Sequence, residues 1–149
     1  MKLMIMLHLL GVVVWVGGMF FAYMALRPAA SALLDPPQRL PLWSATLQRF
    51  FGWVWVSVAL VLGSGFYMLS AIGSAARVPS YVHVMLYIGV AMTIIFAYVY
   101  AVPFAALKRA VAGKNWKEGG AALNRIRIAV AVNLGLGLLN IVVATAGAM

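Results

Sequence analysis

Cysteine is absent from this 149-residue sequence, and acidic residues are almost absent, since Asp35 and Glu118 are the only two. Without cysteine, disulfides, thiolate metal sites and thiol nucleophiles are excluded. Two acids in separate predicted loops argue against catalysis by paired carboxylates and against a carboxylate cage for a hard cation. Charged residues make up 9% of the chain, whereas a soluble domain carries about 25%. The expected solvent for most of the surface is therefore lipid.

Four apolar runs divide the chain, and each is long enough for a helix that crosses a bilayer, which takes about 20 residues. Backbone groups in lipid must be hydrogen-bonded within their segment, and the period-two alternation of barrel strands is missing. The expected fold class is all-α: an integral membrane four-helix bundle of up-down topology, in one domain over residues 1–149. Pro103 is expected to bend the third helix near its end. The predicted spans cover residues 3–26, 50–72, 81–107 and 128–148.

Basic residues set the expected orientation. The net charge is +9 at pH 7, but the basic side chains gather between apolar runs, which indicates membrane topology rather than a nucleic-acid surface. Of the 11 Lys and Arg residues, only Lys2 and Arg77 lie outside the first and third connections. Those connections should be cytoplasmic, with both termini outside. We expect a multi-pass protein of a bacterial inner (cytoplasmic) membrane, with the lipid bilayer as partner and no nucleic acid.

The only two histidines, His8 and His83, both fall inside predicted spans. His8 lies near the start of the first span and His83 near the start of the third, and these helices run in the same direction. With a rise of about 1.5 Å per residue, the two imidazoles should lie at similar depth. An ionisable group inside a membrane is costly and suggests function, and imidazole is the commonest metal ligand. With no cysteine and no buried acid, haem iron and copper are the metals that these histidines suit.

Residues near the histidines fit a flat cofactor. Gly11 and Trp15 share a helix face with His8, where the glycine leaves room for a macrocycle and the indole packs against its edge. Tyr87 shares a face with His83 in the same way.

Arg77 and Lys2 lie at the rim of this end, where the propionates of a haem would point. Plain structural explanations remain open for all of these residues. Small residues allow close helix packing, aromatic side chains favour the membrane interface, and either histidine could simply face lipid headgroups.

Methionine offers a second interpretation. Met4 lies one turn before His8, and Met85 lies two residues after His83. Thioethers together with imidazoles suit Cu(I). The nine methionines form no continuous ladder through the bilayer, and methionine is also a common packing residue, so we rank copper conduction below a fixed haem.

The fourth span carries two asparagines, Asn133 and Asn140, seven residues apart on one helix face. Side-chain amides at such positions commonly hydrogen-bond a neighbouring helix. Contact with a cofactor is the alternative.

Several short motifs resemble the membrane domain of the CopD (copper resistance protein D) family. The resemblance covers all four spans, and the same broad group is similar to the HemJ-type protoporphyrinogen oxidase, a four-helix membrane protein that binds b-type haem. The matching segments are Leu7–Gly11, Trp15–Gly18, Leu26–Ala29, Arg49-Phe50 and Gly63–Gly65.

The HemJ resemblance implies that His8 is a haem ligand, because the first-helix histidine of those proteins has that role. Near the start of the third helix those proteins have a lysine, and here the place is taken by His83. This departure implies ligation by two histidines. The Leu-Pro-Arg-Leu pattern and a later histidine of HemJ are missing, which argues against porphyrinogen oxidation.

Together these observations predict a membrane b-type haem-binding protein with His8 and His83 as axial ligands, acting in electron transfer or haem handling. Gly11, Trp15, Tyr87 and Arg77 would contact the haem. The alternatives are a copper-binding or copper-transport protein of the CopD type, a HemJ-like protoporphyrinogen oxidase, and a cofactor-free subunit. An oxidoreductase activity is compatible with haem, but no catalytic residue is identified. A homodimer is expected, and a quinone or a periplasmic redox protein would be its electron partner.

Overall fold

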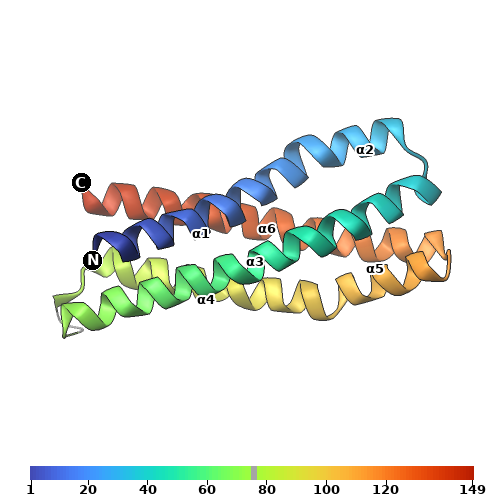
Figure 1. Ribbon diagram of the computed structural model, residues 1–149. Coiled ribbons are helices and arrows are strands. Elements are labelled where there is room, and N and C mark those ends of the chain that lie inside the picture. Colours follow the sequence, from blue (N-terminus) through green and yellow to red (C-terminus); the bar gives the residue numbers. More distant parts are fainter. Residues whose placement is uncertain (75–76) are drawn as a thin grey trace.

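A computed structural model describes residues 1–74 and 77–149, and every regular element in those residues is a helix (Figure 1). Four of these helical stretches are long and apolar enough to cross a membrane. The all-α, four-span fold is therefore confirmed. The elements are α1 (Lys2–Phe21), the π-helix η1 (Ala22–Leu26), α2 (Arg27–Leu33), α3 (Pro36–Ile72), α4 (Ser80–Ala101), α5 (Pro103–Ala112) and α6 (Trp116–Ala148).

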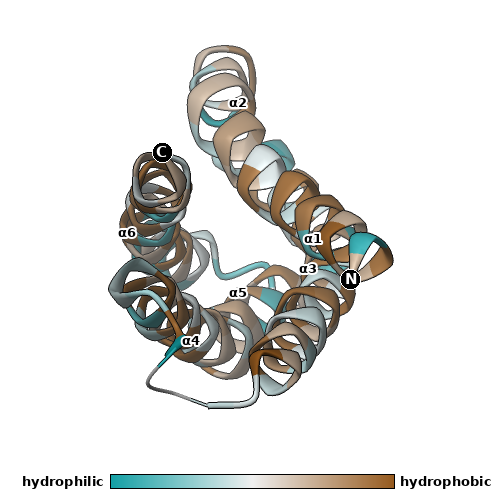
Figure 2. Ribbon diagram, turned by 90° about the vertical axis from the view of Figure 1, so that its left-hand side faces the viewer, coloured by the Kyte–Doolittle hydropathy of each residue, from teal (hydrophilic) through white to brown (hydrophobic). Residues whose placement is uncertain are grey.

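The long helices alternate in direction and lie side by side, so both chain termini are at the same end of the bundle (Figure 1). We call this end the histidine end, since His8 and His83 lie near it, and the opposite end the basic end. Helix α1 packs mainly against α3, and α4 packs mainly against α6. Viewed from the histidine end, α1 and α4 stand at opposite corners, with α3 and α6 between them (Figure 2).

The helices continue well beyond the predicted spans at the basic end. Helix α3 begins at Pro36 rather than near residue 50, and α6 begins at Trp116 rather than near residue 128. Asp35 has an extended backbone and Pro36 fills the first helical position, which favours an early start of α3. Glu118 was expected in a loop; that expectation is wrong. It lies in the first turn of α6, where its backbone N–H donates to the Asn115 side chain at 3.3 Å.

The break predicted near Pro103 is confirmed. Helix α4 ends at Ala101, Val102 has φ −114° and ψ −78°, and Pro103 begins α5. Proline cannot donate the hydrogen bond that would continue α4. The change of direction carries α5 against α6 and α3, where Phe104 and Leu107 are completely buried.

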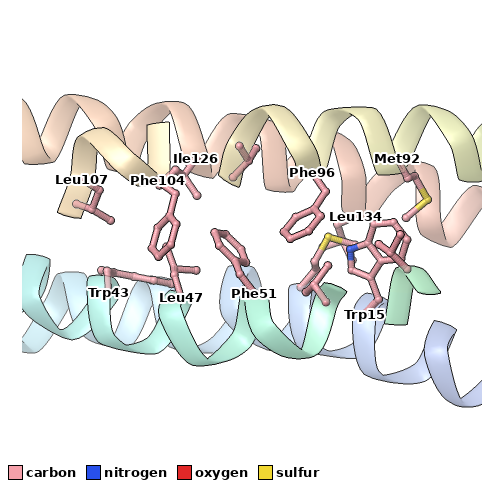
Figure 3. Packing of buried hydrophobic residues seen from close by; sticks show 14 of the residues in the cluster. Trp15, Trp43, Leu47, Phe51, Met92, Phe96, Phe104, Leu107, Ile126 and Leu134 are labelled. Atoms are coloured by element: carbon pink, nitrogen blue, oxygen red, sulfur yellow. The ribbon is translucent and has the colours of Figure 1, made fainter. Parts of the chain in front are cut away.

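Buried aromatic and aliphatic side chains fill the middle and the basic end of the bundle (Figure 3). The ring of Phe51 lies 4.9 Å from that of Phe104 and 5.3 Å from that of Phe96, both edge-on, a favoured arrangement for aromatic pairs. Leu40, near the basic end, is 1% exposed. At the histidine end the picture is different. None of the described residues in the ranges 1–10, 65–74, 77–91 and 138–149 is fully buried.

Candidate functional site

His8 is anchored to the facing helix α3. Its Nδ1 atom lies 3.0 Å from the carbonyl oxygen of Val61 and 3.0 Å from the hydroxyl oxygen of Ser64. The Ser64 hydroxyl itself donates to the carbonyl of Leu60, one helical turn earlier. These contacts hold the imidazole against α3, and the residue is half-buried.

These contacts determine which ring nitrogen of His8 carries the proton. A carbonyl oxygen can only accept, so Nδ1 must donate to Val61. The proton of Ser64 is directed at Leu60, which leaves a lone pair of the hydroxyl for the same Nδ1–H. A neutral imidazole with its proton on Nδ1 presents an unprotonated Nε2. Metal-binding histidines are commonly held in this way, with one nitrogen donating to a carbonyl and the other facing the metal.

Gly11 allows α1 and α3 to approach closely near this contact, and Gly65 lies next to the imidazole. A Cβ atom on Gly11 would lie 2.8 Å from a methyl group of Val61 and 3.1 Å from the carbonyl oxygen of Ser57. A Cβ atom on Gly65 would lie 3.6 Å from Cε1 of His8, so the imidazole rests over that residue. The space beside Gly11 is thus occupied by α3, and Gly11 acts in helix packing. Its predicted contact with haem stays a prediction.

His83 lies in the first turn of α4 and is half-buried. Its imidazole makes no hydrogen bond with any residue that the structure describes. It is at the same end of the bundle as His8, as expected from sequence, but α1 and α4 occupy opposite corners there (Figure 2). The contacts of His8 run to α3, and ligation of one metal by both histidines stays a prediction.

The other residues predicted to surround a haem are spread over different environments. Trp15 is 3% exposed and packs edge-on against Phe96, with 6.3 Å between ring centroids. Tyr87 is 68% exposed on the surface of α4. Arg77 and Lys2 are exposed at the histidine end. The structure therefore places Trp15 in the core, while the other three side chains face outward.

Methionine side chains accompany His8 on both helices. Met4 precedes His8 by one turn on α1, and Met68 follows Ser64 by one turn on α3; both are half-buried. Helices α1 and α3 are antiparallel, and His8 is in register with Ser64. The turn of α1 that carries Met4 therefore faces the turn of α3 that carries Met68. One imidazole nitrogen and two thioethers are brought to the same region of the histidine end.

The two asparagines of α6 bind α4, as the helix-packing interpretation predicts. Asn133 donates from Nδ2 to the carbonyl of Met92 at 3.1 Å, and Asn140 donates to the carbonyl of Met85 at 3.3 Å. Both side-chain oxygens are buried and have no hydrogen-bond partner among the residues that the structure describes. Each amide therefore joins α6 to α4 and keeps an unused acceptor.

Nowhere among the described residues do three His, Asp or Glu side chains gather as they would around a metal ion.

Residues 44–147 match the family described as copper resistance protein D (CopD). The chain belongs to the CopD family. The matched region contains α4, α6 and most of α3, and so includes Ser64, Met68 and His83, while α1 with His8 precedes it. No curated protein and no solved structure matches the chain. The resemblance to the CopD family is confirmed over residues 44–147, while the motifs quoted from the first span lie before the matched region and stay a prediction. The chain is a multi-pass membrane protein of this family.

Sequence reasoning missed Ser64, Met68 and the Val61 carbonyl as neighbours of His8. Gly63-Ser64-Gly65 stood out as a motif of the resemblance, but its place opposite His8 depends on the register between α1 and α3. A small-polar-small triplet in an apolar helix was the available signal. Such a triplet lets a neighbouring helix come close and gives it a hydrogen-bonding group.

Proposed function

We propose that this CopD-family protein binds Cu(I) at the histidine end of the bundle, as part of copper transport or copper tolerance. His8 supplies the Nε2 ligand, and Met4 and Met68 supply thioether sulfur. The observation that supports this most strongly is the hydrogen bond from Nδ1 of His8 to the Val61 carbonyl. It fixes the tautomer and orientation that a metal ligand requires.

The chemistry of the donor set suits copper in its reduced state. Thioether and imidazole ligands are soft or intermediate, and such ligands select Cu(I). Asp35 and Glu118 are the only acidic residues, and neither lies at the histidine end. That end therefore has no carboxylate ligand for a hard cation. Copper is here the cargo of the protein, and His83 with Met85 on α4 provide a second imidazole and thioether at the same end.

Cu(I) titration of the detergent-purified protein against a coloured Cu(I) chelator tests the proposal. We expect stoichiometric binding by the wild type and at least a tenfold loss of affinity in His8→Ala. Loss of a residue that only supports a metal ligand already costs about 10- to 100-fold in affinity. Met4→Leu and Met68→Leu should each weaken binding. Met24→Leu is the matched control, because Met24 lies exposed on η1, away from this end. Unchanged affinity in His8→Ala would overturn the assignment.

A b-type haem is the second candidate, and the presence of both histidines at one end of the bundle favours it. His8 and His83 would be its axial ligands. Electron transfer or haem handling would follow, in a monomer or a homodimer. The absorption spectrum decides: a sharp low-spin α-band after dithionite reduction supports haem, and a colourless protein from haem-replete cells removes this candidate.

A further inference from the structure

A cavity of about 230 Å³ opens at the basic end between η1, α2, α3 and α6, far from the histidines. Three arginines line it: Arg27, Arg39 and Arg127. The rest of its wall is largely apolar and includes the buried side chains of Trp43 and Leu47. The cavity thus combines a cluster of positive charge with a hydrophobic floor.

Within residues 1–74 and 77–149, the three guanidinium groups contact only neutral partners. Arg27 donates to the carbonyl of Tyr23 at 3.4 Å and stacks over the ring of the same tyrosine, 4.5 Å from its centroid. Arg39 donates to the carbonyl of Leu34 at 3.4 Å, and Arg127 to the side-chain oxygen of Asn124 at 2.8 Å.

No acidic residue lines the cavity, since neither Asp35 nor Glu118 belongs to its wall. Each guanidinium has five N–H donors in a planar fork, so most donors stay available. Arginine forks suit phosphate oxygens, which they bind through paired hydrogen bonds. The electrostatic complement of this wall is an anion with several oxygens.

The cavity lies at the depth of lipid headgroups. Leu3 opens the apolar part of the first helix, and Arg27 lies 24 positions later, which corresponds to about 36 Å at 1.5 Å per residue. The hydrocarbon core of a bilayer is about 30 Å thick, and headgroups extend it to about 40–45 Å. Arg27 therefore falls in the headgroup layer.

The π-helix η1 contributes to this wall. Its wider turn interrupts the regular α-helix at Ala22–Leu26, and both Ala22 and Tyr23 line the cavity. Single π turns within α-helices occur frequently at functional sites. The basic end thus combines an irregular helical turn, a cavity and arginines without an acidic partner in its wall.

We propose that this cavity binds one anionic phospholipid. Its phosphate contacts Arg27, Arg39 and Arg127, and the first part of an acyl chain lies against Trp43 and Leu47. Free inorganic phosphate would satisfy the arginines but leave the apolar floor unused. Basic pockets between membrane helices are known to favour acidic lipid headgroups. The proposal is independent of any metal at the histidine end.

Native mass spectrometry of the full chain in mild detergent tests this proposal. The protein is titrated with phosphatidylglycerol, with phosphatidylcholine of the same acyl chains, and with inorganic phosphate. The triple variant Arg27→Gln, Arg39→Gln, Arg127→Gln should bind phosphatidylglycerol at least tenfold more weakly than wild type and bind phosphatidylcholine equally. The matched control, Arg49→Gln, Arg109→Gln, Arg125→Gln, removes the same charge from exposed positions outside the cavity and should stay within twofold of wild type.

If the triple variant does not fold, two single variants test the same proposal. Arg127 and Arg125 are two residues apart on α6 and both are exposed, but only Arg127 lines the cavity. Arg127→Gln should weaken phosphatidylglycerol binding at least threefold, and Arg125→Gln should not. Equal losses in the two variants would show diffuse charge attraction and overturn the proposal. Equal uptake of both lipids, or phosphate binding as strong as phosphatidylglycerol binding, would overturn it as well.

Discussion

The Nδ1 atom of His8 donates a hydrogen bond of 3.0 Å to the carbonyl oxygen of Val61, which lies 53 positions further along the chain. This contact holds the imidazole of α1 against α3 and leaves Nε2 as its free, unprotonated nitrogen. A membrane helix has few ways to orient an imidazole, because polar partners are scarce in lipid. The Val61 carbonyl, the Ser64 hydroxyl and the close approach of the two helices supply them here.

Ser64→Ala should weaken Cu(I) binding by up to about tenfold, at the low end of what loss of a supporting partner costs a metal site. The variant removes one of the two acceptors near Nδ1, while the Val61 carbonyl remains. Competition with a Cu(I) chelator measures the effect. Ser70→Ala is the control, because Ser70 is exposed on the same helix and its hydroxyl donates to the Tyr67 carbonyl of that helix. Equal affinities for the two variants would mean that Ser64 does not position His8.

Gly11→Ala should lower the stability of the protein by about 1–3 kcal/mol, the usual effect of adding volume to a close-packed contact. The new methyl group would lie 2.8 Å from Val61 and 3.1 Å from the backbone of α3. Gly17→Ala is a matched control on the same helix, since nothing lies within 4 Å of its added methyl group. Thermal unfolding in detergent compares the two. If both variants melt at the wild-type temperature, α1 and α3 are not in the contact described.

Asn133→Ala should destabilise the packing of α4 on α6 by about 1 kcal/mol, in the range measured for hydrogen bonds between membrane helices. The variant loses the bond from Nδ2 to the Met92 carbonyl but also removes a buried oxygen without a partner, which limits the effect. Thr145→Ala serves as the control, because Thr145 is exposed and bonds only carbonyls of its own helix. Unfolding in increasing SDS gives the free-energy difference, and an Asn133 variant as stable as the control would contradict a bridging role.

Membrane orientation can be tested directly because the chain has no cysteine of its own. The distribution of basic residues predicts that the α5–α6 connection lies in the cytoplasm. A cysteine introduced at Lys114 should therefore react with a membrane-impermeant maleimide only after cell lysis. A cysteine at Ser74, exposed at the other end of the bundle, should react without cell lysis. The reverse pattern would invert the topology.

Local patterns allowed the four helices and the break at Pro103 to be predicted, because run length, hydrophobicity and a missing N–H act within one segment. The extent of α3 and α6 beyond the bilayer was missed, since those turns are polar enough to resemble connections. The partners of His8 could not be predicted. They depend on the register between α1 and α3, which is set by the close approach at Gly11 and by the contact between His8 and Ser64 in the folded bundle. The arginine cavity was likewise not predicted, because its wall combines residues of η1, α2, α3 and α6 that only the folded bundle brings together.

X-ray absorption at the copper edge of the Cu(I)-loaded protein tests the central claim most directly. We expect a spectrum of mixed nitrogen and sulfur ligation in the wild type, and in His8→Ala a loss of the nitrogen contribution with sulfur retained. Met68→Leu should show the opposite change, a weaker sulfur contribution with the nitrogen retained. A copper environment that is identical in the wild type and His8→Ala would contradict the assignment of His8 Nε2 as a copper ligand.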